Sequence, residues 1–130
     1  MSLKKTIFAA LALAAALAAG AQTYVGTMTI GDYTQRGVEV TLTQKQGGSA
    51  SALMHRVKFA RMMPVRLDVE LKPLRLADGR LAADSLVPTA GNKSYEKFTV
   101  RRLAGTADAS ALRFKCRMGK KELAFDGKKK

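Results

Sequence analysis

The sequence predicts an all-β protein, an antiparallel up-and-down barrel of about eight strands. Helical periodicity is absent after residue 21, whereas apolar and polar residues alternate with a period of two along most of the remaining chain. Short turn signals containing Gly, Asp or Pro separate the alternating runs. Consecutive hairpins with one apolar face suit a barrel or a sandwich. An open meander of this length would leave unpaired edge strands, and closure into a barrel removes them, so the barrel is favoured.

The first 21 residues form a targeting segment rather than a part of the fold. Lys4 and Lys5 precede an apolar run over 7–19, and the small residues Ala19 and Ala21 occupy the −3 and −1 positions of a cleavage site. This arrangement predicts a Sec signal peptide over 1–21, a mature domain over 22–130, and a periplasmic or secreted protein. The apolar run is shorter than the roughly 20 residues of a membrane-spanning helix, so we expect no such span.

Four alternating runs fill the first half of the predicted domain. They cover residues 24–30, 38–43, 53–59 and 65–72. The last is the clearest strand, since Pro64 and Pro73 stand at its two ends, where a missing backbone donor is tolerated.

The second half continues the pattern of hairpins. Asp78-Gly79 is a strong hairpin turn, followed by a run over 81–87, a loop over 88–94 and a strand over about 95–103. After a turn over 105–110 come alternating runs over 112–118 and 123–125, and the chain ends in a basic tail of three lysines.

Composition excludes most catalytic and metal chemistry. A single cysteine and a single histidine exclude a disulfide framework, a Cys-based zinc site and a His-paired metal site. Asp68 and Glu70 have the spacing of a catalytic carboxylate pair, but Arg66 and Lys72 flank them, as in a solvated ion-pair face. We therefore expect a non-catalytic protein without a cofactor. Cys116 falls on an apolar face, which predicts a buried, inert thiol.

Several motifs are shared with a known family: YVGTMTI, GVEVTLT, a Gly-Gly turn, PVRLDVEL with a following Asp-Gly hairpin, LAADSLVP, and the ending FKCRMGKKELAFDGKK. Together they resemble the lipocalin-like (calycin-like) β-barrel domains exported by Bacteroidetes. The resemblance covers the mature chain and implies an eight-stranded antiparallel barrel. The Gly-x-Trp motif of true lipocalins is absent and the chain has no Trp, so no functional residue is carried over.

A barrel of this size is either filled by side chains or holds one small ligand. The leading hypothesis is a binding module that carries a small apolar or amphipathic ligand inside the barrel; the alternative is that the same residues form a solid core. In the run 53–59 the alternation predicts one face shared by Leu53, His55, Val57 and Phe59. The candidate ligand-binding residues are Val40, Leu53, His55, Val57, Phe59, Val69, Phe98 and Phe114.

The net charge of +13 suggests a second kind of partner. Arg113, Lys115 and Arg117 share one strand face at spacings of about 7 Å, so they form a candidate anion-binding row. Such a field attracts an anionic envelope glycolipid or polysaccharide; the alternative is that the charge only keeps the protein soluble and its strand edges from aggregating. The interleaved aromatics of single-stranded nucleic-acid binders are missing, so we expect no specific nucleic-acid partner.

Overall fold

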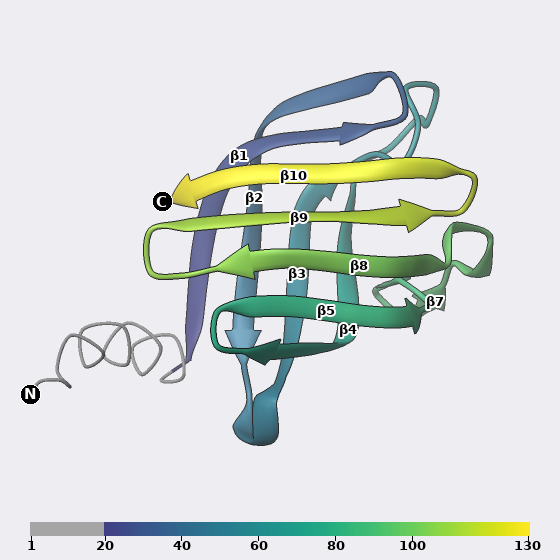
Figure 1. Ribbon diagram of the computed structural model, residues 1–130. Helices are drawn as coiled ribbons and strands as arrows, with labels where there is room; N and C mark the ends of the chain where they lie inside the picture. Colours follow the sequence, from purple (N-terminus) through teal and green to yellow (C-terminus); the bar gives the residue numbers. More distant parts are fainter. Residues whose placement is uncertain (1–19) are drawn as a thin grey trace, which may run out of the picture.

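The computed structural model describes residues 20–130, and all but the last two residues of the predicted signal peptide lie outside this range. The described chain forms a closed antiparallel barrel of eight long strands (Figure 1). These strands are β1 (Ala21–Ile30), β2 (Tyr33–Gln44), β3 (Ser49–Val57), β4 (Leu67–Ala77), β5 (Arg80–Leu86), β8 (Val100–Ala107), β9 (Ala111–Met118) and β10 (Lys121–Lys129).

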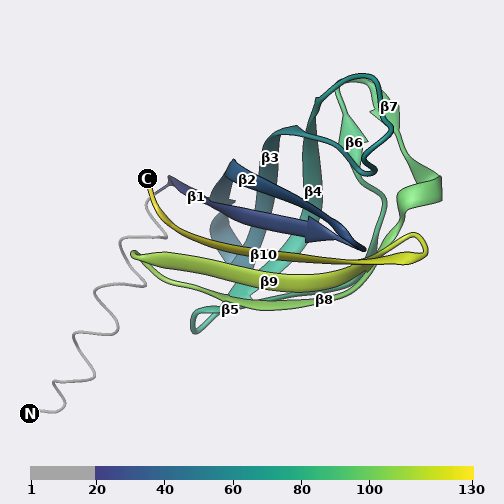
Figure 2. The same ribbon diagram turned by 90° about the horizontal axis from the view of Figure 1, so that it is seen from above.

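Each long strand pairs with its neighbour in the chain, β3 pairs with β4, and β10 returns to pair with β1. Seen from above, the strands curve around one interior (Figure 2). The predicted all-β barrel is therefore confirmed. Each of these eight strands therefore pairs with another long strand on both sides, and the β4–β5 pairing is confined to the three residue pairs next to their hairpin.

Four short elements lie in the connections between the long strands. A 3₁₀ turn, η1 (Gln46–Gly48), joins β2 to β3, and a second, η2 (Glu96–Phe98), precedes β8. The predicted loop over 88–94 contains a small hairpin, β6 (Thr89–Ala90) and β7 (Lys93–Ser94). The predicted strand from residue 95 instead begins at Val100, because 95–99 fold into the turn around η2.

The alternation is interrupted inside β4. The prediction that this strand ends at Pro73 is wrong, because β4 continues to Ala77. The register of the β3–β4 pair shifts between Ala50 and Ala52, and the buried positions of β4 change from Val69 and Leu71 to Leu74 and Leu76. Pro73 has no backbone N–H to donate to the neighbouring strand, and the irregularity lies where this hydrogen bond would be missing. Because of this irregularity, both halves of β4 direct apolar side chains into the core.

The C-terminal lysines are part of the barrel, which corrects the prediction of a basic tail. Lys128 and Lys129 lie in β10, opposite Val25 and Tyr24 of β1. The backbone N–H of Lys129 donates to Ser110, and the Lys130 ammonium lies 3.0 Å from a Glu39 carboxylate oxygen. The end of β10 therefore completes the ring of strands.

Candidate anion-binding surfaces on a packed barrel

The barrel interior is filled by side chains. Among the predicted ligand-lining residues, Val40, Val57 and Val69 have 0% of their surface accessible, Phe59 has 1% and Phe114 has 2%. A hollow that admits even a water molecule would expose the side chains that line it. These five residues therefore contact other protein atoms on all sides, and a ligand would have to push them apart.

Leu53 and His55 do not share a face with Val57 and Phe59, which corrects the predicted face. Both are partly exposed, whereas Met54 between them is fully buried. Arg56 adopts a positive φ of 53°, and the β3–β4 register shifts between Met54 and Val57. This bulge inserts one residue and turns the face of the strand over.

His55 instead belongs to a polar network on the outside of the barrel. Its Nε2 lies 2.9 Å from Thr41 Oγ1, which in turn lies 2.8 Å from Thr23 Oγ1. Glu39 stands opposite His55 in the β2–β3 pair. The histidine therefore has a local polar partner on the sheet surface and no access to the interior.

Phe98 lies at one end of the barrel rather than along its wall. It is half-buried, and its ring centroid is 4.5 Å from that of Phe59. Tyr95 contacts Phe59 from a second direction, with ring centroids 6.1 Å apart. These aromatic contacts cover the end of the core beneath η2.

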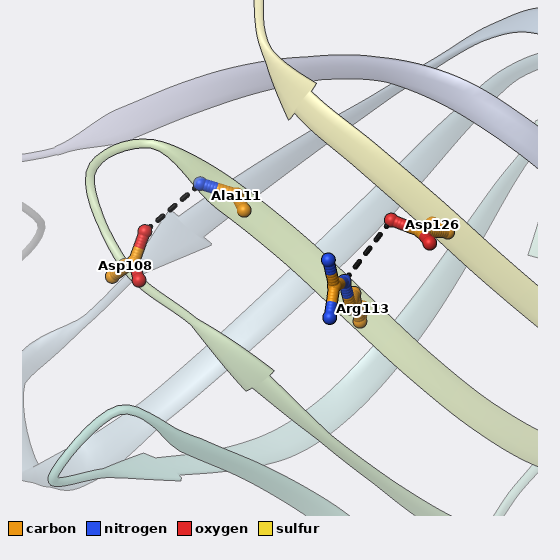
Figure 3. A network of polar contacts seen from close by, with 4 residues as sticks. All are labelled: Asp108, Ala111, Arg113 and Asp126. Atoms are coloured by element: carbon orange, nitrogen blue, oxygen red, sulfur yellow. Dashed lines mark hydrogen bonds and ion pairs between the residues drawn. The ribbon is translucent and has the colours of Figure 1, made fainter.

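The predicted basic row on β9 is exposed on the outer surface. Arg113 forms an ion pair with Asp126 of β10, at 3.1 Å between Nε and Oδ1 (Figure 3), and Glu122 stands opposite Arg117. Lys115 has alanines on both sides, Ala124 in β10 and Ala104 in β8. Within the described residues, Lys115 and Arg117 have no carboxylate within 4.0 Å.

A shallow hollow of about 560 Å³ surrounds Lys115 on the outer wall. We name it the Lys115 groove. Its floor consists mainly of small residues, because β1, β8 and β10 contribute Thr, Ala and Gly to it. Its lining residues are Thr27, Thr29, Ala104, Gly105, Thr106, Arg113, Phe114, Lys115, Ala124, Phe125 and Asp126. On one side of the groove, Arg117 of β9 stands opposite Arg101 of β8 in the strand register.

A second hollow, of about 470 Å³, lies outside β2, β3 and β4. Three arginines line it, Arg36, Arg56 and Arg66, and none of them forms an ion pair among the described residues. The sequence alternation did not indicate this cluster. Arg56 reaches it through the bulge in β3, and Arg66 comes from the following loop, so no regular spacing connects the three.

Two buried groups on the core side ionise less readily than usual. Burial raises the pKa of the Cys116 thiol to about 12, which agrees with the buried thiol expected from the sequence. Burial, with the nearby Asp108 charge, raises the pKa of Tyr24 to about 12, and its hydroxyl donates to the Asp108 carbonyl at 2.7 Å. Hydrogen bonds from Ser110 and Ala111 lower the pKa of Asp108; the bond from the Ala111 backbone is drawn in Figure 3.

The carboxylates Asp68 and Glu70 are each engaged by a neighbour. Asp68 accepts the backbone N–H of Arg56 at 2.9 Å, and Glu70 lies 3.5 Å from the Lys72 ammonium. Over residues 20–130, no three His, Cys, Asp or Glu side chains are grouped so as to hold a metal ion.

Comparisons with known proteins add no relative: no family model, no curated protein and no solved structure matches the chain. Within the described part of the chain, no helix has both the length and the apolar character required to cross a membrane.

Proposed function

We propose that this protein is an exported, non-catalytic binding module of the lipocalin-like type that binds acidic envelope glycoconjugates with its outer wall. The contact is the Lys115 groove, and the ligand chemistry is the carboxylate or phosphate of an acidic polysaccharide or glycolipid. The observation that carries the proposal is Lys115 itself, a cation flanked by alanines and without a carboxylate partner within the described residues.

The surroundings of Lys115 favour an extended polymer. Its small neighbours allow a chain to approach the sheet closely, and the two cations on its own strand, Arg113 and Arg117, stand about 7 Å away along β9. Phe114 and Phe125 direct their rings into the core, where each is only 2% exposed. The groove therefore offers no aromatic platform on which nucleic-acid bases would stack.

A ligand inside the barrel has less support than one outside. The inward residues are packed, and the two partly exposed residues predicted to accompany them, Leu53 and His55, lie on the outer wall. Opening a cavity would expose apolar surface that a domain of this size needs for its stability. An interior ligand is therefore the competing outcome of the test.

The experiment is a binding titration with polygalacturonate, and neutral dextran is the uncharged control. We expect polygalacturonate to bind and its affinity to fall steeply as salt rises, because exposed charges are screened beyond about 8 Å at physiological ionic strength. The double variant Lys115→Gln/Arg117→Gln should bind at least about tenfold more weakly, a loss of about 1.4 kcal/mol.

The matched control is Lys45→Gln/Lys93→Gln, which removes the same charge from two exposed positions outside the groove. It should lose much less affinity than the groove variant. Equal losses in both variants would show that only the overall charge matters, and absence of polygalacturonate binding at low salt would refute the proposal.

A further inference from the structure

One end of the barrel exposes an apolar loop. The 58–66 loop joins β3 to β4, and its Met62 side chain is 89% exposed, with Val65 at 55%. The next most exposed large hydrophobic residue in the described chain is Val87, at 36%. The loop thus carries the two most exposed large hydrophobic side chains of the described residues.

This loop is held in place rather than loosely attached. The Gln35 side chain forms two hydrogen bonds with the backbone of Lys58, both at 3.0 Å. The backbone N–H of Phe59 donates to the Met63 sulfur at 3.0 Å, and the Arg61 guanidinium lies over the Tyr33 ring at 5.5 Å. Met63 thus packs against the core while its neighbour Met62 points outward.

Cations surround the base of the loop. Arg36, Arg56 and Arg66 line the hollow of about 470 Å³ described above, together with the carboxylates of Glu39 and Asp68. A neighbouring hollow of about 660 Å³ shares Arg56 and Arg66 but is bordered by Val65 and Leu67. The two arginines therefore lie between a charged hollow and an apolar one.

The carboxylates at this end are already engaged. Glu39 pairs with Lys130 at 3.0 Å, and Asp68 accepts the Arg56 backbone N–H and so holds the bulge in place. The four ion pairs within the described residues involve none of the three arginines. The Arg66 guanidinium donates one hydrogen bond to the Arg56 carbonyl, at 3.3 Å, and keeps further N–H donors for an anion. Planar guanidinium groups bind phosphate well.

We propose that this end of the barrel docks on an anionic lipid bilayer. Met62 and Val65 enter the headgroup region, and Arg36, Arg56 and Arg66 bind lipid phosphates. A water-soluble polyanion would satisfy the arginines but would leave the apolar tip in water, whereas a bilayer offers both an anionic surface and an apolar layer beneath it. The inference is independent of the Lys115 groove, since the two surfaces share no lining residue.

The absence of tryptophan from the chain allows a direct test. Met62→Trp creates a single fluorescent reporter at the loop tip, and Lys45→Trp places the same reporter beside η1, at the opposite end of β3. On addition of vesicles containing phosphatidylglycerol, the emission of Met62→Trp should shift to the blue, while that of Lys45→Trp should not. Vesicles of pure phosphatidylcholine should leave both unchanged.

Sedimentation with the same vesicles separates the two proposed surfaces. Met62→Ser/Val65→Ser and Arg36→Gln/Arg66→Gln should each lose about tenfold or more in vesicle affinity, equivalent to about 1.4 kcal/mol. Lys115→Gln/Arg117→Gln should retain it. Because Met62 and Val65 are exposed, their serine variant should unfold at the same temperature as the natural protein.

Several results would overturn the inference. One is vesicle binding that is unaffected by Met62→Ser/Val65→Ser and weakened by the groove variant, which would mean attraction by charge alone. Another is absence of binding to phosphatidylglycerol vesicles. Polygalacturonate binding, measured on the same variants, reports on the groove separately, so either proposal can fail without the other.

Discussion

The two faces of β9 differ in both packing and charge. Its inward residues Leu112, Phe114, Cys116 and Met118 are at most 5% exposed, whereas Arg113, Lys115 and Arg117 between them are exposed. The inner face is apolar and closely packed; the outer face carries charge above a floor of small residues. Stability depends on the inward residues and the proposed binding on the outward ones, so substitutions one position apart should separate the two.

The largest expected effect on the free energy of unfolding comes from removing a large side chain on the inner face of β9. Phe114→Ala removes a ring that lies 5.7 Å from the Phe125 ring within the core, and it should lower the free energy of unfolding by about 3–5 kcal/mol. Lys115→Ala, one residue further, should change it by no more than about 0.5 kcal/mol. Urea denaturation measures both, and similar losses in the two variants would contradict the division between the faces.

A smaller loss is expected where two strands approach each other closely. A Cβ at Gly105 would overlap the Arg113 carbonyl and the Phe114 side chain across the β8–β9 pair. Gly105→Ala should therefore lower the free energy of unfolding by about 1–3 kcal/mol. Gly37→Ala is a useful comparison, since its Cβ would meet no atom and its cost arises only from the positive φ of 68°.

The inner face should also make stability depend on alkaline pH. The pKa of Cys116 rises from 9.0 to about 12 on burial, so above pH 9 the unfolded chain loses a proton that the folded protein retains. The stability contribution is complete below pH 9 and declines toward pH 12, by up to about 1.4 kcal/mol per pH unit.

Cys116→Ala should flatten this decline in denaturation curves recorded at successive pH values. Tyr24 titrates in the same direction and supplies the slope that remains. An unchanged slope in Cys116→Ala would show that the thiol is already ionisable in the folded state, as would its rapid reaction with a thiol reagent at neutral pH.

The smallest stability effect is expected on the outer face. Asp126→Asn breaks an exposed ion pair with Arg113, so the free energy of unfolding should change by less than about 1 kcal/mol. Polygalacturonate should bind this variant more tightly, because a carboxylate leaves the groove and a guanidinium is released. Weaker binding would place the polymer elsewhere on the surface.

Regular alternation made part of this molecule predictable from its sequence. In β9 the buried and exposed residues follow each other without interruption, so the basic row and the buried Cys116 were both placed on the correct face. In β3 and β4 the pattern is displaced by irregularities at Arg56 and around Pro73. A displacement by one residue reverses the faces before it relative to the faces after it, so an alternation continued through Val57 and Phe59 assigned the preceding His55 to the interior.

The arginine cluster near the 58–66 loop was not predictable in this way. Its members come from β2, from the bulge of β3 and from a loop, and only the closed barrel brings them together. The sequence pattern also could not predict that the interior is packed. The same apolar pattern is compatible with a filled barrel or a hollow one, and the volumes of the inward side chains decide between them.

The central claim is that this barrel binds with its outside, and one NMR titration tests it most directly. Polygalacturonate is added to the labelled protein while backbone amides and core methyl groups are followed together. The account predicts saturable shifts at Ala104, Lys115 and Ala124, with the methyl groups of Val40, Val69 and Leu112 unchanged. Saturable shifts of those core methyl groups, with the amides around Lys115 unaffected, would contradict it.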